Sequence, residues 1–381
     1  MSVPSAIVVG AGIVGAACAE ALARAGCHVT VLESAFAGAG ATGAAMGHLV
    51  VMDDSEAQFA LTSFSRRLWA ESAGSLPPEI EDDPCGTLWV AADEEEMGHV
   101  RRRAAFYEAR GEKAEVLDAA ALRRAEPQLR PDLLGALRVP GDRNLYPPAA
   151  ARLLLERARL LGTEIWAGLR VEAIEPGRAR CGGSRWIKAD LVVNAAGAWA
   201  PCLLPGLPIL PRKGHLVITD RYPGFLRHQV IELGYLTSAH APSRESVAFN
   251  VQPRRTGQLL IGSSRELVGW DDSVNGPLRG RMLRRATGYL PGLARLRALR
   301  TWVGFRPATP DNLPLVGLWE PGLWVAAGHE GLGVTTAPGT AALLAALVLG
   351  RTPPIDPAPF DPRRPMPALE LDPHHLVPRH D

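Results

Sequence analysis

The first 33 residues constrain the fold most, because they predict a strand, a tight turn, a helix and a second strand in close succession. An apolar run rich in β-branched residues, 6–9, leads directly into a GxGxxG motif at 10–15. An alanine-rich helix is predicted over 13–25, and a short strand over 28–32 then leads to the acid Glu33. This order is typical of the βαβ unit that binds a dinucleotide.

Each glycine of this motif, and the acid that follows it, has a physical role in holding a dinucleotide. Gly10 permits the tight turn, Gly12 lets the backbone approach a pyrophosphate, and Gly15 lets helix and strand pack closely. The helix N-terminus presents its positive dipole end to the phosphates. Glu33 follows Gly15 by 18 residues, and we expect it to accept both ribose hydroxyls. No arginine stands beside Glu33, which argues against a ribose 2′-phosphate.

Length and composition narrow the class of protein. A chain of 381 residues with 47% hydrophobic residues can form two closely packed domains. The net charge of +1 gives no reason to expect nucleic acid as a partner. The first strand begins too near Met1 to leave room for a signal peptide, and the longest apolar tract, 341–349, is too short to span a bilayer. We therefore expect a cytoplasmic protein, free or peripheral at the inner face of the membrane. The five cysteines have no metal-ligand spacing, so no metal site is expected.

The pattern along the chain predicts an α/β fold whose first domain is interrupted twice. Helices are predicted at 54–72, 93–110, 118–126, 148–161, 276–289 and 338–349, and strands at 85–90, 135–139, 163–166, 169–174, 189–194, 214–219, 246–251, 258–262 and 322–328. Residues 1–80, 149–205 and 310–365 are predicted to form a Rossmann-like domain with a parallel sheet covered by helices. Residues 81–148 and 206–309 are predicted to form a smaller α+β substrate domain with an antiparallel or mixed sheet. Residues 366–381 are a proline-rich tail.

Glycine-rich strand-to-loop junctions recur at Gly10, Gly197 and Gly328. Three such junctions are more than a nicotinamide coenzyme needs, whereas an FAD held along its whole length would use all of them. The return to the nucleotide domain at the C-terminal end favours the same cofactor. No cysteine follows Cys202, so a cysteinyl link in the C-terminal third is absent and we expect FAD to be bound noncovalently.

Four ordered motifs carry a resemblance to a known family. They are the N-terminal βαβ unit, VVNAAGAWA at 192–200, WVGFRPxTPD at 302–311 and AGHEGLG at 327–333. With these motifs the sequence resembles the D-amino-acid oxidase family of flavoproteins, which includes glycine oxidase, sarcosine oxidase and D-amino-acid dehydrogenases. The resemblance runs from residue 3 to about residue 365.

Within the family, residues 40–54 and the extended segments of 234–254 look most like D-hydroxyproline dehydrogenases. Similar segments occur in D-proline and opine-type dehydrogenases and in cyanide-forming glycine dehydrogenase subunits.

The resemblance implies FAD-dependent oxidation of a D-amino or cyclic imino acid, with D-proline and hydroxy-D-proline favoured, by hydride transfer from the α-carbon to flavin N5. The product would be an imine. The electron acceptor would be a quinone, another carrier or a partner subunit. Two alternatives remain: a glycine- or sarcosine-type oxidase that uses oxygen, and an FAD-bearing subunit of a multi-subunit dehydrogenase. A homo- or hetero-oligomer is left open.

The resemblance also implies which side chains meet the substrate. Arg306 stands at the arginine that anchors the substrate carboxylate in the family, although it could instead tie the loop before Pro307 to a backbone carbonyl. His48 and His329 would hydrogen-bond the flavin or line the pocket, or serve structure alone. Asn250 lies on a strand that faces the substrate in relatives, with a cross-strand hydrogen bond as the alternative. Tyr235 is a further pocket candidate, with Ser238 and His240 weaker still.

The predicted cofactor contacts extend over every glycine-rich junction. Backbone N–H groups of 331–336 would face flavin N1 and C2=O, where negative charge develops, and Val171 would bond the adenine through its backbone. Thr335 could equally cap the following helix. The full set is Gly10, Gly12, Ile13, Val14, Gly15, Glu33, Ser34, Thr42, Gly43, Ala44, Met46, Gly47, His48, Val171, Ala195, Ala196, Gly197, Trp199, Gly304, Gly328, His329, Gly331, Leu332, Gly333, Val334 and Thr335.

Overall fold

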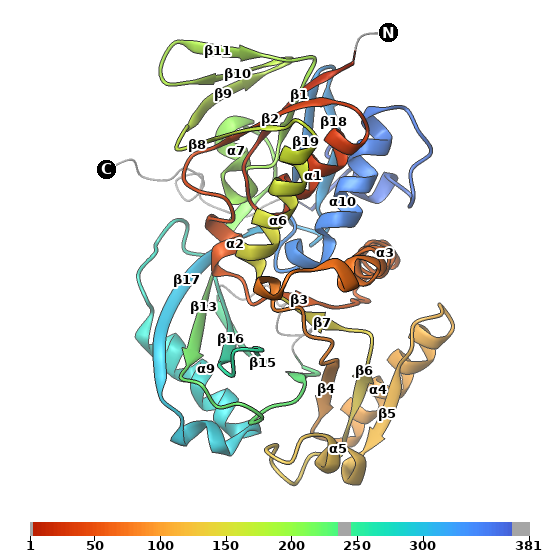
Figure 1. Ribbon diagram of the computed structural model, residues 1–381. Coiled ribbons are helices and arrows are strands. Elements are labelled where there is room, and N and C mark those ends of the chain that lie inside the picture. The colour runs from red at the N-terminus through yellow and green to blue at the C-terminus, as the bar shows by residue number, and fades with distance from the viewer. Residues whose placement is uncertain (1–2, 235–244, 368–381) are drawn as a thin grey trace.

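Two large sheets organise the computed structural model, which describes residues 3–234 and 245–367 (Figure 1). The first sheet has six strands in the order β18-β19-β12-β1-β2-β8, and every neighbouring pair is parallel except β18 and β19. Their bounds are β1 (Ser5–Val9), β2 (His28–Glu33), β8 (Glu164–Ala167), β12 (Leu191–Asn194), β18 (Leu315–Glu320) and β19 (Leu323–Ala327). All six lie within the stretches predicted for the Rossmann-like domain.

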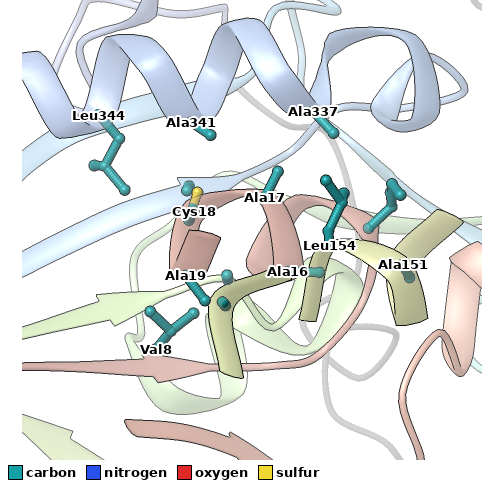
Figure 2. Close-up of a cluster of buried hydrophobic side chains, with 14 of the residues drawn as sticks. Val8, Ala16, Ala17, Cys18, Ala19, Ala151, Leu154, Ala337, Ala341 and Leu344 are labelled. Atoms are coloured by element: carbon teal, nitrogen blue, oxygen red, sulfur yellow. The ribbon is translucent and has the colours of Figure 1, made fainter. Parts of the chain in front are cut away.

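Helix α1 (Ile13–Arg24) is the centre of the core on one face of this sheet. It packs between α6 (Pro147–Leu160) and α10 (Gly333–Val348). Figure 2 shows buried side chains of the three helices, most of them small: Ala16, Ala17, Cys18, Ala19, Ala151, Leu154, Ala337, Ala341 and Leu344. Alanines at these contacts let the backbones approach closely at native packing density. The packing fixes the N-terminus of α1 directly after β1.

The second sheet has eight strands in the order β17-β13-β16-β15-β14-β4-β6-β5. Only β14 and β4 are parallel neighbours, so the sheet is mixed. The bounds are β4 (Thr87–Ala91), β5 (Glu115–Asp118), β6 (Gly135–Val139), β13 (Leu210–Thr219), β14 (Gln229–Glu232), β15 (Glu245–Pro253), β16 (Leu259–Glu266) and β17 (Ala298–Ala308). The predicted α/β class, with a parallel-type sheet and a second mixed sheet, is confirmed.

The remaining elements connect or cover these sheets. The helices are α2 (Gly40–Ala44), α3 (Glu56–Ser72), α4 (Glu94–Glu108), α5 (Ala119–Ala125), α7 (Ala200–Leu203) and α9 (Gly276–Tyr289), with 3₁₀ turns Ala73–Ser75, Pro78–Ile80, Gly197–Trp199, Pro291–Arg295 and Ala358–Phe360. Strands β3 (His48–Leu49) and β7 (Arg143–Asn144) form a two-stranded ladder. Strands β9 (Val171–Glu175), β10 (Arg178–Cys181) and β11 (Arg185–Lys188) form a separate antiparallel sheet. The sequence predicted both β8 and β9 as strands, but only β8 joins the six-stranded sheet, whereas β9 pairs with β10 in the separate sheet.

The last helix begins earlier than the sequence predicted. A start at about Pro338 was expected, because proline favours the first turn of a helix, but α10 starts at Gly333 and contains Pro338 in its interior. Proline lacks the N–H that would bond the carbonyl of Val334. The indole Nε1 of Trp69, on α3, donates instead to the carbonyls of Val334 (3.1 Å) and Thr335 (3.2 Å). A side chain from a distant helix therefore compensates the bond that Pro338 removes.

Trp69→Phe should lower the free energy of unfolding by about 1–3 kcal/mol, because it leaves a buried carbonyl without a donor. The loss should be smaller in a Pro338→Ala background, where the new backbone N–H can reach the Val334 carbonyl. Urea unfolding of the two single variants and the double variant measures this coupling. Equal losses in both backgrounds would contradict the compensation.

Among the residues that the structure describes, no helix combines the length and apolar character that crossing a membrane requires.

Candidate active site

One cavity of ≈ 1540 Å³ runs from the turn after β1 to β17 and the loop before α10. Its walls come from both sheets, from α2 and from the 3₁₀ turn after β12. A typical small-molecule pocket measures roughly 300–1,000 Å³, so this cavity has room for a long cofactor and a substrate together. No group of three or more metal-ligating side chains occurs among residues 3–234 and 245–367.

The turn after β1 leaves no room for side chains. Gly10 has φ +106°, and a Cβ atom there would lie 2.6 Å from the carbonyl oxygen of Ala195. A Cβ on Gly15 would lie 2.0 Å from the carbonyl oxygen of Gly10. Gly12 lines the cavity at the start of α1, where the first backbone N–H groups of the helix point outward. This geometry provides the anion-binding helix end that a pyrophosphate needs.

Glu33 lies at the carboxyl end of β2 and lines the same cavity. Its Oε2 accepts a hydrogen bond from Ala11 N (2.7 Å), and its Oε1 accepts from Ala35 N (2.8 Å) and Ser34 Oγ (3.2 Å). These bonds fix the carboxylate beside the glycine turn. In that position it can accept ribose hydroxyls.

The small-residue segment around α2 forms the next part of the wall. Thr42 Oγ1 accepts from Ile13 N (3.0 Å), which joins α2 to the start of α1. Ala44 accepts from the indole Nε1 of Trp302 (3.2 Å), and a Cβ on Gly304 would lie 2.4 Å from the Cβ of Ala44. The segment is thus held against β17 at a distance that only small residues allow.

These features fit a flavin dinucleotide: a cradle closed by glycines, an acid at the ribose position and a continuous cavity beyond it. Of the predicted cofactor residues, the cavity is lined by Gly10, Gly12, Ile13, Val14, Glu33, Ser34, Thr42, Ala44, Met46, Gly47, His48, Val171, Ala195, Ala196, Gly197, Trp199, Gly304, His329, Gly331, Gly333 and Val334. Five others, Gly15, Gly43, Gly328, Leu332 and Thr335, do not line it. Thr335 instead joins α10 to β3, since its Oγ1 donates to the carbonyl of His48 (2.8 Å) and accepts from Val50 N.

Arg306, on β17, lines the cavity beside two glycines, and the first of them leaves no room for a Cβ atom. A Cβ on Gly214 would lie 2.1 Å from its Nη1, and a Cβ on Gly331 would lie 3.7 Å from its Nε. Its Nη1 donates to the carbonyl of Ser264 (3.0 Å). The side chain therefore bonds a backbone carbonyl, which was one interpretation of the sequence, and it also lines the cavity. Its role as the carboxylate anchor stays a prediction.

The two histidines occupy different environments. Burial lowers the pKa of His48 to about 4, and its Nε2 is buried beside the cavity with no hydrogen-bond partner among the residues that the structure describes. His329 Nε2 is 3.0 Å from Thr340 Oγ1 on α10, and burial lowers its pKa to about 3. Both rings are therefore neutral at pH 7. The Nε2 atom of His329 is hydrogen-bonded to Thr340 within the fold, whereas Nε2 of His48 can bond a ligand in the cavity.

The buried neutral state of His329 predicts acid sensitivity. An unfolded histidine has a pKa near 6.5, so the unfolded chain binds one more proton below that pH. Stability should fall as the pH drops from about 6.5 toward 3, by roughly 1.4 kcal/mol per pH unit from this group. His329→Gln can keep the bond to Thr340 and should make the fall less steep. Urea unfolding at pH 7, 6 and 5 measures the slope, and identical slopes in both proteins would contradict the interpretation.

Two further buried polar atoms belong to residues that line the cavity, and neither has a hydrogen-bond partner within residues 3–234 and 245–367. They are Oδ1 of Asn250, on β15, and Oγ of Ser263, on β16, in side chains that are 3% and 2% exposed. Asn250 pairs with Gly262 across the two strands, which places Ser263 next to it. Tyr235, Ser238 and His240 lie outside the described residues.

Several lining residues were not selected from the sequence. Ser263 was missed because β16 was predicted to end at 262, whereas it continues to Glu266. Glu330 stands within the AGHEGLG motif but was not distinguished from its neighbours. Residues that line the cavity near Val171 and at the tail also carried no motif: Arg170, Pro205, Gly206, Leu207, Pro208, Met366 and Pro367.

Comparison with known proteins identifies the fold and its cofactor. Residues 5–347 match the family model described as DAO, FAD dependent oxidoreductase. The chain belongs to the DAO family. The predicted resemblance is confirmed, and FAD is the cofactor of the family.

Three relatives illustrate the range of the DAO family near this chain. The hydrogen cyanide synthase subunit HcnC of Pseudomonas aeruginosa is 29% identical over 93% of this chain and 94% of its own length. A D-amino acid dehydrogenase of Methylobacterium is 30% identical over 80% of this chain and 73% of its own length. The crystal structure of glycine oxidase from Geobacillus kaustophilus superposes with a TM-score of 0.85 at 28% identity, covering 96% of this chain and 100% of that one. The protein is thus an FAD-dependent oxidoreductase of the DAO family.

Proposed function

We propose that the protein oxidises a D-amino or cyclic imino acid at its α-carbon and releases an imine. The observation that carries the proposal is the guanidinium of Arg306, which lies against Gly214 and bonds the carbonyl of Ser264 at the cavity wall. A guanidinium offers two parallel donors to a carboxylate, a geometry that a lysine ammonium cannot reproduce. Arg306 would therefore hold the substrate by its carboxylate.

The other residues of the cavity would orient the substrate. Bound FAD supplies the hydride acceptor at N5. Neutral His48 can hydrogen-bond the amine or the cofactor ring through its buried Nε2, and Asn250 Oδ1 can accept from an N–H. No side chain has to act as a general base if the amine is already neutral, so the catalytic contribution of these residues is mainly positioning.

The cofactor would lie along the glycine-lined part of the cavity. The N-terminus of α1 would face the pyrophosphate, and Glu33 would accept the ribose hydroxyls. At the opposite end, the first backbone N–H groups of α10, from Gly333 and Val334, would stabilise negative charge on the flavin pyrimidine. We expect noncovalent binding.

Within this class we favour D-proline-like substrates, with hydroxy-D-proline first, and a quinone, carrier or partner subunit as electron acceptor. The support is the resemblance of 40–54 and 234–254 to D-hydroxyproline dehydrogenases. The purified yellow protein should be bleached anaerobically by D-proline or hydroxy-D-proline and recover slowly in air. Bleaching by glycine or sarcosine with rapid reoxidation would favour the oxygen-using oxidase instead. A flavin that no amino or imino acid reduces would contradict the proposal.

A second candidate is an FAD-bearing subunit of a larger amino-acid dehydrogenase, located in the cytoplasm or peripherally at the inner face of the membrane. The similarity to HcnC, a subunit of hydrogen cyanide synthase, favours it. Purification of the tagged protein from its native cells would distinguish the two. Stoichiometric co-purifying subunits that raise the rate of flavin reduction would support the complex, and a lone active protein would exclude it.

A further inference from the structure

Glu330 occupies an unusual backbone position beside Arg306. It has φ +46°, a left-handed conformation that is uncommon for a residue other than glycine. Its N–H donates to the carbonyl of Pro307 (2.9 Å), so the loop before α10 is bonded to β17 one residue beyond Arg306. Strained positions of this kind persist where the surrounding structure requires them, and they cluster at functional sites.

Three guanidinium groups surround the Glu330 carboxylate. Oε1 is 3.6 Å from Arg212 Nη1 on β13 and 3.6 Å from Arg265 Nε on β16, and the positive charge of Arg306 also acts on the carboxylate. Burial by itself would raise the pKa of this carboxyl, but Arg265, Arg306 and Arg212 together lower it to about 2. Glu330 therefore carries its negative charge at neutral pH.

One oxygen of this carboxylate still accepts no hydrogen bond. Oε2 accepts from Gly331 N, whereas Oε1 is buried and has no hydrogen-bond donor in the part of the chain that the structure describes. Glu330 lines the main cavity together with Arg306. It also borders a small adjoining cavity of ≈ 70 Å³, which it shares with His48 and Asn250. A charged acceptor and a charged donor thus lie on one wall of the cavity, and the structure shows no direct ion pair between them.

We propose that Glu330 recognises the amine of the substrate while Arg306 holds its carboxylate, so that the site selects amino and imino acids over simple carboxylates. This inference rests on the proposed function. An α-amino or α-imino acid brings both groups on one carbon, which matches a donor and an acceptor placed side by side. A buried acceptor left without a donor is costly, so a ligand that lacks the N–H should be rejected.

The net charge of this cavity wall affects the protonation state of the substrate amine. Arg212, Arg265 and Arg306 outnumber the one carboxylate, and the nearby His48 ring is neutral, so the wall keeps a net positive charge. A net positive wall favours the neutral amine over the ammonium ion. Glu330 therefore provides a local acceptor for an N–H without making the pocket anionic.

A matched ligand pair tests this assignment without turnover. 1-Aminocyclopentanecarboxylate carries both groups but has no α-hydrogen to transfer, and cyclopentanecarboxylate lacks only the amine. Binding of each to the FAD-loaded protein is followed by perturbation of the flavin absorbance and by calorimetry. The wild type should prefer the amino compound, and Glu330→Gln should weaken it by roughly 10- to 100-fold. The same variant should bind the simple carboxylate equally well or more tightly, because a repulsive negative charge is gone.

Other results would overturn the proposal. Equal weakening of both ligands would show that Glu330 only holds the arginines in place, and a wild type without preference would exclude amine recognition. Glu330→Asp keeps the charge and should keep the preference, which covers the case in which Glu330→Gln does not fold. Glu108→Gln, at the exposed end of α4, is a matched charge control and should leave both affinities unchanged. Failure of the proposed function would be separate, since it would be seen as absence of bleaching by any amino acid.

Discussion

Arg306→Lys is expected to lower kcat/KM for amino or imino acid substrates by roughly 10²- to 10³-fold. Lysine keeps the positive charge but loses the planar pair of donors, and its shorter reach leaves the substrate carboxylate poorly bonded inside a buried site. The guanidinium lies directly against Gly214 and donates to the carbonyl of Ser264, so a lysine would also lack the contacts that fix Arg306. Most of the loss should fall on KM if the carboxylate contact is equally strong before and during hydride transfer.

Steady-state kinetics with an artificial electron acceptor measure the effect, and two controls make it specific. Arg300→Lys changes the same residue type on the exposed part of the same strand, β17, and should leave kcat/KM unchanged. The carboxamide of the best substrate has no carboxylate, so it should be a poor substrate for wild type and variant alike. A variant that still discriminates the acid from its amide as strongly as the wild type would contradict the anchoring role.

The part of the cavity proposed to hold FAD was predictable because the residues that shape it lie close together in the sequence. Gly10, Gly15 and Glu33 lie within one βαβ unit, where strand, turn and helix follow one another in the chain and the spacing fixes the geometry. The structure places Gly10 and Glu33 in the cavity wall and Gly15 against the Gly10 carbonyl. The stereochemical reason for each residue can therefore be read from the sequence alone.

The part of the cavity proposed to hold the substrate was less predictable, because the residues that form it are distant in the sequence and meet only in the folded chain. Glu330 meets Arg212 and Arg265 from two different strands, and neither arginine lies in a motif that suggests such a contact. The start of α10 depended in the same way on Trp69, which lies 269 positions before Pro338 in the chain and supplies the missing donor. Local propensity gives a reliable answer only where no distant side chain alters the balance.

Gly15→Ala is expected to release FAD and to destabilise the protein, although alanine is intrinsically the better helix former. The new methyl group would start 2.0 Å from the Gly10 carbonyl oxygen and 3.3 Å from the Cβ of Ala195. Neither backbone can move without shifting β1 or the start of α1. Overpacking of this kind costs roughly 1–3 kcal/mol or more, and the displaced helix end would no longer present its N–H groups to the pyrophosphate.

The flavin-to-protein absorbance ratio after gel filtration, together with the Tm, measures both effects. Gly276→Ala is the matched control, because Gly276 also lies in the first turn of a helix, α9, but has no atom within 4 Å of an added Cβ. It should keep its full FAD content and show no fall in Tm. If Gly15→Ala behaved like this control, close contact between α1 and the β1 turn would not be what holds the cofactor. FAD would then have to be held mainly by Glu33 and by the segment around α2, which accept hydrogen bonds from Ala11 N and Ile13 N.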